Sequence, residues 1–140
     1  MAKDTSKIVE ELGLCPDFKT FYSENSDYMI KENLSELLNG LMEKHGLKKS
    51  QIIREAEMSE VYAYQIFSGI RIPERKKLLC IAVAMKLSLD EVQTLLKSAG
   101  YPTLYVKLPF DSVVLYGICK KLSVVEINEI LFEYELETLG

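Results

Sequence analysis

Cysteine and histidine are scarce in this chain. The sequence has three cysteines, Cys15, Cys80 and Cys119, and one histidine, His45. The odd number and wide spacing of the cysteines do not indicate a disulfide framework, and none lies at metal-ligand spacing from His45. We therefore expect no metal site and no cofactor, and we predict that Cys80 and Cys119 pack inside apolar runs.

The chain also lacks long hydrophobic runs. No apolar segment approaches the roughly 20 residues that a membrane-spanning helix needs. Residues 1–13 lack the basic end and apolar block of a secretion signal. We expect a cytoplasmic protein that does not bind membranes.

Motifs of common enzymes are missing as well. The sequence contains no glycine-rich phosphate loop, no nucleophile elbow and no paired metal motif. One histidine and scattered acids do not make a catalytic constellation. We therefore expect the protein not to be an enzyme.

Charge is unevenly distributed along the 140 residues, whose net charge is −4. Residues 1–30 carry three positive and six negative side chains, and residues 88–140 carry four and eight. Residues 31–87 carry ten positive and seven negative side chains, for a net charge of +3. This middle segment is therefore the best candidate for contact with an acidic partner such as nucleic acid.

Apolar residues repeat at helical spacing from Asn33 onward. They fall at i, i+3, i+4, i+7 and i+8: Leu34, Leu37, Leu38, Leu41 and Met42. Such a stripe covers one face of a helix, and Gly46 is placed to end it. Four more helices are expected at 49–56, at 60–67, from Pro73 onward, and at 89–98. Ser59 and Ser88 are placed as N-caps, the second with Glu91 in a capping box.

Little in the sequence indicates β-structure. Thr103–Leu108 is the only strand-like piece, and the prolines on either side of it favour an extended connector. Near the N-terminus, residues 1–13 are compatible with a short helix, whereas residues 15–27 show no period and are interpreted as a loop or arm. The sequence thus predicts an all-α protein.

The C-terminal part of the chain, from Leu78 onward, contains an internal repeat. The segment "LLCIAVAMKLSLDEVQTLLKSAGYPTL" (Leu78–Leu104) aligns without gaps with "VVLYGICKKLSVVEINEILFEYELETL" (Val113–Leu139). Ser88 matches Ser123, and Leu87 matches Leu122. Each unit is predicted to form a helix, a serine-capped turn and a second helix, so the repeat indicates two helical hairpins that stack on each other.

The acidic and apolar end of the second unit allows two interpretations. It can be a last helix packed in the core, or it can form a self-association surface. The residues of that surface would be Ile127, Ile130, Leu131 and Tyr134.

The segment His45–Val92, "HGLKKSQIIREAEMSEVYAYQIFSGIRIPERKKLLCIAVAMKLSLDEV", carries an ordered set of familiar positions. They are Gly46-Leu47, Ile52, Ala56, Ser59, Ile66, the Gly69-x-Arg71-x-Pro73 exit, Leu78, Ile81-Ala82, Met85 and Leu89–Val92. In this order they resemble the lambda-repressor-like, or Cro/Xre, helix-turn-helix family over about residues 33–99. The resemblance implies a five-helix DNA-binding domain at 31–100, preceded by an N-terminal arm at 1–30. A C-terminal helical hairpin at 101–140 would pack on it.

The resemblance also implies which residues meet DNA. The helix at 59–68 would enter the major groove, beginning at the cap residue Ser59. Glu60 would accept from a cytosine amino group, Val61 would touch a thymine methyl, and Gln65 would pair with adenine. The hydroxyls and cations around them would contact phosphates: Lys48, Lys49, Tyr62, Tyr64, Ser68 and Arg71.

Two departures from the family pattern affect the geometry. Lys48-Lys49 replace a usual Ser-Gln pair, which keeps cations near the backbone but removes a glutamine. Glu57 replaces a usual glycine, so either Glu57 adopts a positive φ at some cost or the turn differs.

Two functions remain open at this point. The first is a sequence-specific transcriptional regulator that binds double-stranded DNA as a homodimer. The second is a protein–protein interaction module whose outer face binds a protein instead, since tyrosines suit such interfaces. The acidic C-terminal hairpin is a further possible surface for a protein partner.

Overall fold

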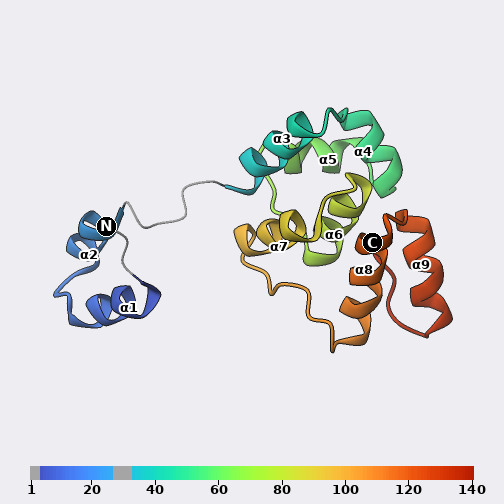
Figure 1. Cartoon of the computed structure of the whole chain (residues 1–140). Coiled ribbons are helices and arrows are strands. Elements are labelled where there is room, and N and C mark those ends of the chain that lie inside the picture. The colour runs from blue at the N-terminus through green and yellow to red at the C-terminus, as the bar shows by residue number, and fades with distance from the viewer. Residues whose placement is uncertain (1–3, 27–32) are drawn as a thin grey trace. The chain divides into compact units, whose positions relative to one another are not determined.

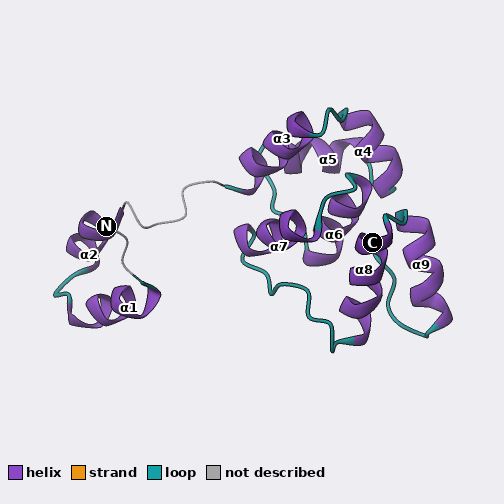
Figure 2. Cartoon of the chain, viewed as in Figure 1, coloured by secondary structure: helices purple, strands orange, loops and turns teal. Residues whose placement is uncertain are grey.

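A computed structural model describes residues 4–26 and 33–140, and each of these two ranges belongs to a compact unit of its own. All regular structure in the described residues is helical, with loops between the helices and no strand (Figure 2). This confirms the all-α prediction. None of the described helices combines the length and apolar character needed to cross a bilayer.

The N-terminal unit contains two helices, α1 (Thr5–Leu14) and α2 (Phe18–Asn25). Each begins at an aspartate whose side chain accepts a hydrogen bond from the first turn: Asp4 from Lys7 N–H, and Asp17 from Thr20 N–H. The interpretation of residues 15–27 as a loop or arm is therefore wrong from Phe18 to Asn25. With only eight residues, α2 is too short to display a clear apolar period.

Seven helices follow in the second unit (Figure 1). They are α3 (Leu34–Lys44), α4 (Lys49–Ala56), α5 (Glu60–Phe67), α6 (Arg75–Ala84), α7 (Leu89–Ser98), α8 (Pro109–Lys120) and α9 (Val124–Glu133). Helix α6 lies in the middle, in contact with α4, α7 and α9, while α3 packs on α5 and α7. Six of the ten residues of α6 are buried, which explains why the sequence of α6 shows no polar face.

The start of α6 differs from the prediction. Pro73 was expected at the first helical position, but the helix begins at Arg75 with Glu74 as N-cap. Pro73 is buried in the preceding loop, where its carbonyl accepts a hydrogen bond from the Tyr101 hydroxyl at 2.7 Å. Proline at N1 is a local preference, and here a tertiary contact decides the position instead.

Helices α4, α6, α8 and α9 are each followed by a non-glycine residue with φ between 55° and 59°: Glu57, Lys86, Lys121 and Glu135. After α4, for example, Glu57 N–H donates to Arg54 O and Met58 N–H donates to Ile53 O, the Schellman pattern. This settles the alternative at Glu57, which takes the positive φ.

The internal repeat is a structural one. Helices α7 and α9 occupy equivalent stretches, and both begin with a serine–glutamate capping box. The segment that follows each hairpin folds back on the hairpin's second helix and forms equivalent hydrogen bonds with it. Gln93 holds both backbone groups of Leu104, at 2.8 and 3.1 Å, and the equivalent Asn128 holds those of Leu139, at 2.7 and 3.3 Å.

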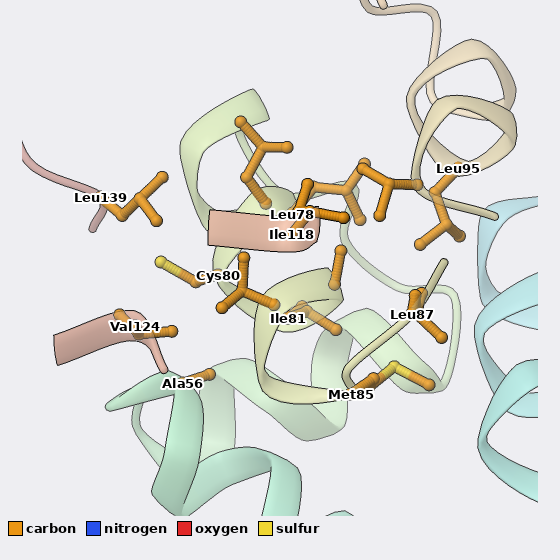
Figure 3. Packing of buried hydrophobic residues seen from close by; sticks show 14 of the residues in the cluster. Ala56, Leu78, Cys80, Ile81, Met85, Leu87, Leu95, Ile118, Val124 and Leu139 are labelled. Atoms are coloured by element: carbon orange, nitrogen blue, oxygen red, sulfur yellow. The ribbon is translucent and has the colours of Figure 1, made fainter. Parts of the chain in front are cut away.

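One apolar core joins these elements (Figure 3). Ala56 of α4, Cys80 and Ile81 of α6 and Val124 of α9 are among its members. Ile127 and Leu131 are also fully buried in it. Their burial agrees with the interpretation that the last helix packs in the core. Of the four residues proposed for self-association, only Ile130 and Tyr134 remain accessible.

Candidate nucleic-acid interface

Helices α4 and α5 are joined by a sharp three-residue connection. Ser59 caps α5, its hydroxyl accepting from Tyr62 N–H at 3.2 Å. Ala63 and Ile66 are buried on the inner face of α5, and the backbone carbonyl of Phe67 accepts from the Asn39 amide of α3 at 2.8 Å. Both ends of α5 are therefore held by hydrogen bonds, which fixes the direction of its outer face.

The outer face of α5 carries most of the residues predicted to meet DNA. Glu60, Val61, Tyr64 and Ser68 are exposed, with 69% of Val61 and 52% of Tyr64 accessible. Gln65 is half-buried on the same helix. Glu60, Val61, Tyr64 and Ser68 are therefore accessible to a partner of α5, whereas Gln65 and Tyr62 are accessible only in part.

A cation from α4 lies against this face. The Lys49 ammonium is 5.1 Å from the centroid of the Tyr64 ring and 5.6 Å from that of Phe67. Lys49 is the first residue of α4, and Lys48 is its exposed N-cap. Free backbone N–H groups, the helix dipole and two lysines are thus combined at one end of α4, an arrangement that favours an anion such as phosphate.

A second cation lies on the other side. The Arg71 guanidinium is 5.3 Å from the centroid of the Tyr62 ring, and Arg71 itself is exposed in the loop after α5. Tyr62 is half-buried, so the two tyrosines lie in different surroundings, each beside its own cation. A surface pocket of about 370 Å³ adjoins this pair, lined also by Glu57, Glu74 and Lys77 among others.

Sequence reasoning missed three residues that shape this surface. Ile70 and Ile72, on either side of Arg71, are 78% and 65% exposed. Two isoleucines in a segment outside any expected helix were a signal that could have drawn attention to them. The role of Asn39 had no sequence signal, because its partner Phe67 lies 28 residues away.

Among residues 4–26 and 33–140, no three or more histidine, cysteine, aspartate or glutamate side chains lie together so that they could hold a metal ion. Burial raises the pKa of the Cys80 thiol to about 11, with Lys77 opposing and Glu57 reinforcing the shift. Cys80 is therefore a protonated core residue rather than a nucleophile at neutral pH. Cys119 is exposed on α8, so the prediction that it packs inside is wrong.

Comparison with protein-family models, with curated proteins and with solved structures finds no match to this chain.

Proposed function

We propose that this protein is a sequence-specific DNA-binding regulator of the Cro/Xre type. In this proposal, α3–α7 form the five-helix domain, α4 and α5 form its helix-turn-helix, and α5 lies in the major groove. The observation that carries the proposal is the placement of Lys49 and Arg71 beside Tyr64 and Tyr62 of α5. A helix that enters the groove needs donors for the phosphates along it, and these two cations flank its exposed face.

Each side chain has a role under this proposal. Glu60, Val61 and Gln65 contact base edges, while Tyr62, Tyr64 and Ser68 reach phosphates through their hydroxyls. Lys48 and Lys49 clamp one backbone segment and Arg71 clamps another. A homodimer would place two such helices about one helical turn of DNA apart, or a multiple of it.

The exposed apolar residues support the alternative of a protein-binding face. Val61 lies on α5, Ile70 and Ile72 lie in the loop after it, and all three are more than half exposed. Glu60 adds a negative charge at the leading end of the same helix. A partner protein with a complementary apolar surface would cover these residues, and the tyrosines would contribute to that interface.

Substitutions at the base-contacting and phosphate-contacting positions separate the roles. The specific duplex for this test is one obtained by selecting bound sequences from a random pool. We expect Gln65→Ala to weaken binding to that duplex by roughly 5- to 100-fold, with little change in binding to a duplex of random sequence. Lys49→Ala and Arg71→Ala are expected to weaken both and to reduce the slope of log K against log salt by about one each. Titrations of both duplexes at several salt concentrations measure these effects.

The matched control is Lys107→Ala, which removes an exposed cation in the loop before α8, outside the proposed interface. It should leave specific binding and its salt slope unchanged. Equal profiles for Gln65→Ala and Arg71→Ala on the two duplexes would show that the assigned roles are wrong.

A further inference from the structure

The two hairpins of the repeat, α6–α7 and α8–α9, contact each other reciprocally. The Lys86 ammonium donates to Lys121 O and the Lys121 ammonium donates to Lys86 O, both at 3.0 Å. These lysines occupy equivalent positions, so each caps the end of the other's helix. Such an exchange is the signature of a two-fold relation between the hairpins.

A second pair of contacts obeys the same relation. Arg75 forms an ion pair with Asp111 at 3.0 Å. The residues equivalent to these two are Phe110 and Lys76, and the Lys76 ammonium lies 5.8 Å from the centroid of the Phe110 ring. The hairpins therefore share one packing arrangement, although the chemistry of the paired side chains differs.

Equivalent apolar positions differ in burial in spite of this relation. Leu78, Ile81 and Leu95 of the first hairpin are at most 1% exposed. Their equivalents are half-buried Val113, Tyr116 with 53% exposed, and half-buried Ile130. These three line a surface pocket of about 290 Å³ between α8 and α9, together with Ser112 and Tyr134.

Helices outside the repeat account for the difference. Contacts between the two hairpins are shared by both, so they cannot bury one side more than the other. Within residues 33–140, the helices outside the repeat are α3, α4 and α5, of which α3 packs on α7 and α4 packs on α6. The groove at Val113, Tyr116 and Ile130 is thus the surface of α8–α9 that has no counterpart of α3–α5.

The charges around the groove indicate the character of its occupant. In the first hairpin, Glu91 of α7 forms ion pairs at 3.0 Å with Lys44 and His45, which end α3. Its equivalent Glu126 is exposed and forms no ion pair within residues 33–140. Glu133, three residues after Ile130 on α9, is exposed as well.

We propose that the α8–α9 groove binds an amphipathic helix of a partner protein, with cations at its C-terminal end. Its apolar stripe covers Val113, Tyr116 and Ile130, and its terminal cations pair with Glu126, as α3 does on α7. Helix-in-groove recognition uses anchors at i, i+3 or i+4 and i+7, which is the spacing of the buried leucines of α3.

The chain itself supplies a probe for this test. A peptide of residues 33–46 with Glu43→Lys keeps the leucine stripe of α3 and strengthens its basic end. Fluorescence anisotropy of this labelled peptide, titrated with the full chain at low salt, should show saturable binding. Tyr116→Ala and Ile130→Ala are each expected to weaken it by about fivefold or more. Glu126→Gln keeps the capping acceptor and should weaken it about two- to fivefold, an effect that high salt removes.

The matched control is Phe132→Ala, which removes an aromatic residue of α9 that is 79% exposed and outside the groove. It should leave peptide binding unchanged. Absence of saturable binding overturns the proposal, as does binding that the groove substitutions do not weaken. Sedimentation of the chain alone tests a second copy as the occupant. A dimer that Tyr116→Ala dissociates would show that a second copy fills the groove, and this result would overturn the proposal.

Discussion

Glu91 connects two helix ends, the end of α3 and the start of α7, through one carboxylate. Its oxygens lie 3.0 Å from the Lys44 ammonium, 3.0 Å from the His45 ring nitrogen and 2.9 Å from Ser88 N–H. Burial alone would raise its pKa, but the hydrogen bonds from Ser88, His45 and Lys44 outweigh burial and lower the pKa to about 2, from the usual 4.5. Glu91 thereby fixes the end of α3 against the start of α7.

This pKa predicts how stability depends on pH. Because the pKa is depressed in the folded state, the contribution of Glu91 is complete above about pH 4.5 and is lost as the pH falls toward 2. We expect Glu91→Gln to lower the free energy of unfolding by about 1–3 kcal/mol at pH 7. The difference from the unaltered chain should shrink steadily between pH 4.5 and 2, as measured by urea unfolding.

Glu126→Gln serves as the control for this measurement. Glu126 belongs to an equivalent capping box but has no ion pair among the described residues of its unit, so its loss should be smaller. Equal losses at both positions, or a Glu91→Gln effect that persists unchanged at pH 2, would contradict this account.

At this scale the sequence predicted contacts between near neighbours and missed those between distant residues. The capping box of Ser88 and Glu91 was predicted because its two residues are three apart. The ion pairs of Glu91 join residues 46 and 47 positions apart, and no local pattern indicates which surface charges meet. No local pattern indicates the partner of Asn39 either, or the cations that lie beside Tyr62 and Tyr64.

Helices α4, α5 and α7 show how far element prediction reaches. All three have the predicted bounds, because their caps and apolar stripes are local signals. The start of α6 was misplaced because the tertiary contact of Pro73 decides it, and α2 was missed because eight residues carry too little periodicity. The outward positions of the α5 side chains followed from the helical period once its inner face was known.

The left-handed residue after α4 leads to a prediction about helix ends. Glu57 has φ 55°, a conformation that costs a residue with a Cβ roughly 1–2 kcal/mol relative to glycine. Glycine also lowers the free energy of unfolding by about 0.5–1 kcal/mol, because it gives the unfolded chain more conformational freedom. This loss offsets part of the gain. Glu57→Gly should therefore raise the free energy of unfolding by about 0.5–1 kcal/mol, measured by urea unfolding at pH 7.

The control for Glu57→Gly is Glu55→Gly, an exposed position in the last turn of α4 with helical geometry. It should lower the free energy of unfolding by about 1 kcal/mol. If both substitutions destabilise the protein equally, the turn at Glu57 does not have the left-handed conformation described.

On the scale of the whole molecule, the sequence predicted two features, the uneven distribution of charge along the chain and the internal repeat. The electropositive segment 31–87 includes α3–α6 and the cations beside α5, whereas the acidic segment 88–140 includes the α8–α9 groove. The repeat predicted two stacked hairpins, but the reciprocal contacts of Lys86 and Lys121 required the structure. Under our two proposals, the outer face of α5 binds an acidic partner, DNA, and the α8–α9 groove binds a helix with a basic end.

The most direct test of the DNA-binding proposal is selection of bound duplexes from a random pool by the full chain. We expect enrichment of a two-fold-related sequence whose half-sites lie about one helical turn apart, or a multiple of it, with binding that weakens as salt rises. Gln65→Ala should change the enriched bases and not merely the yield. A pool that stays random, together with no retention of any duplex or of heparin at low salt, would contradict DNA binding and favour a protein-binding face on α5.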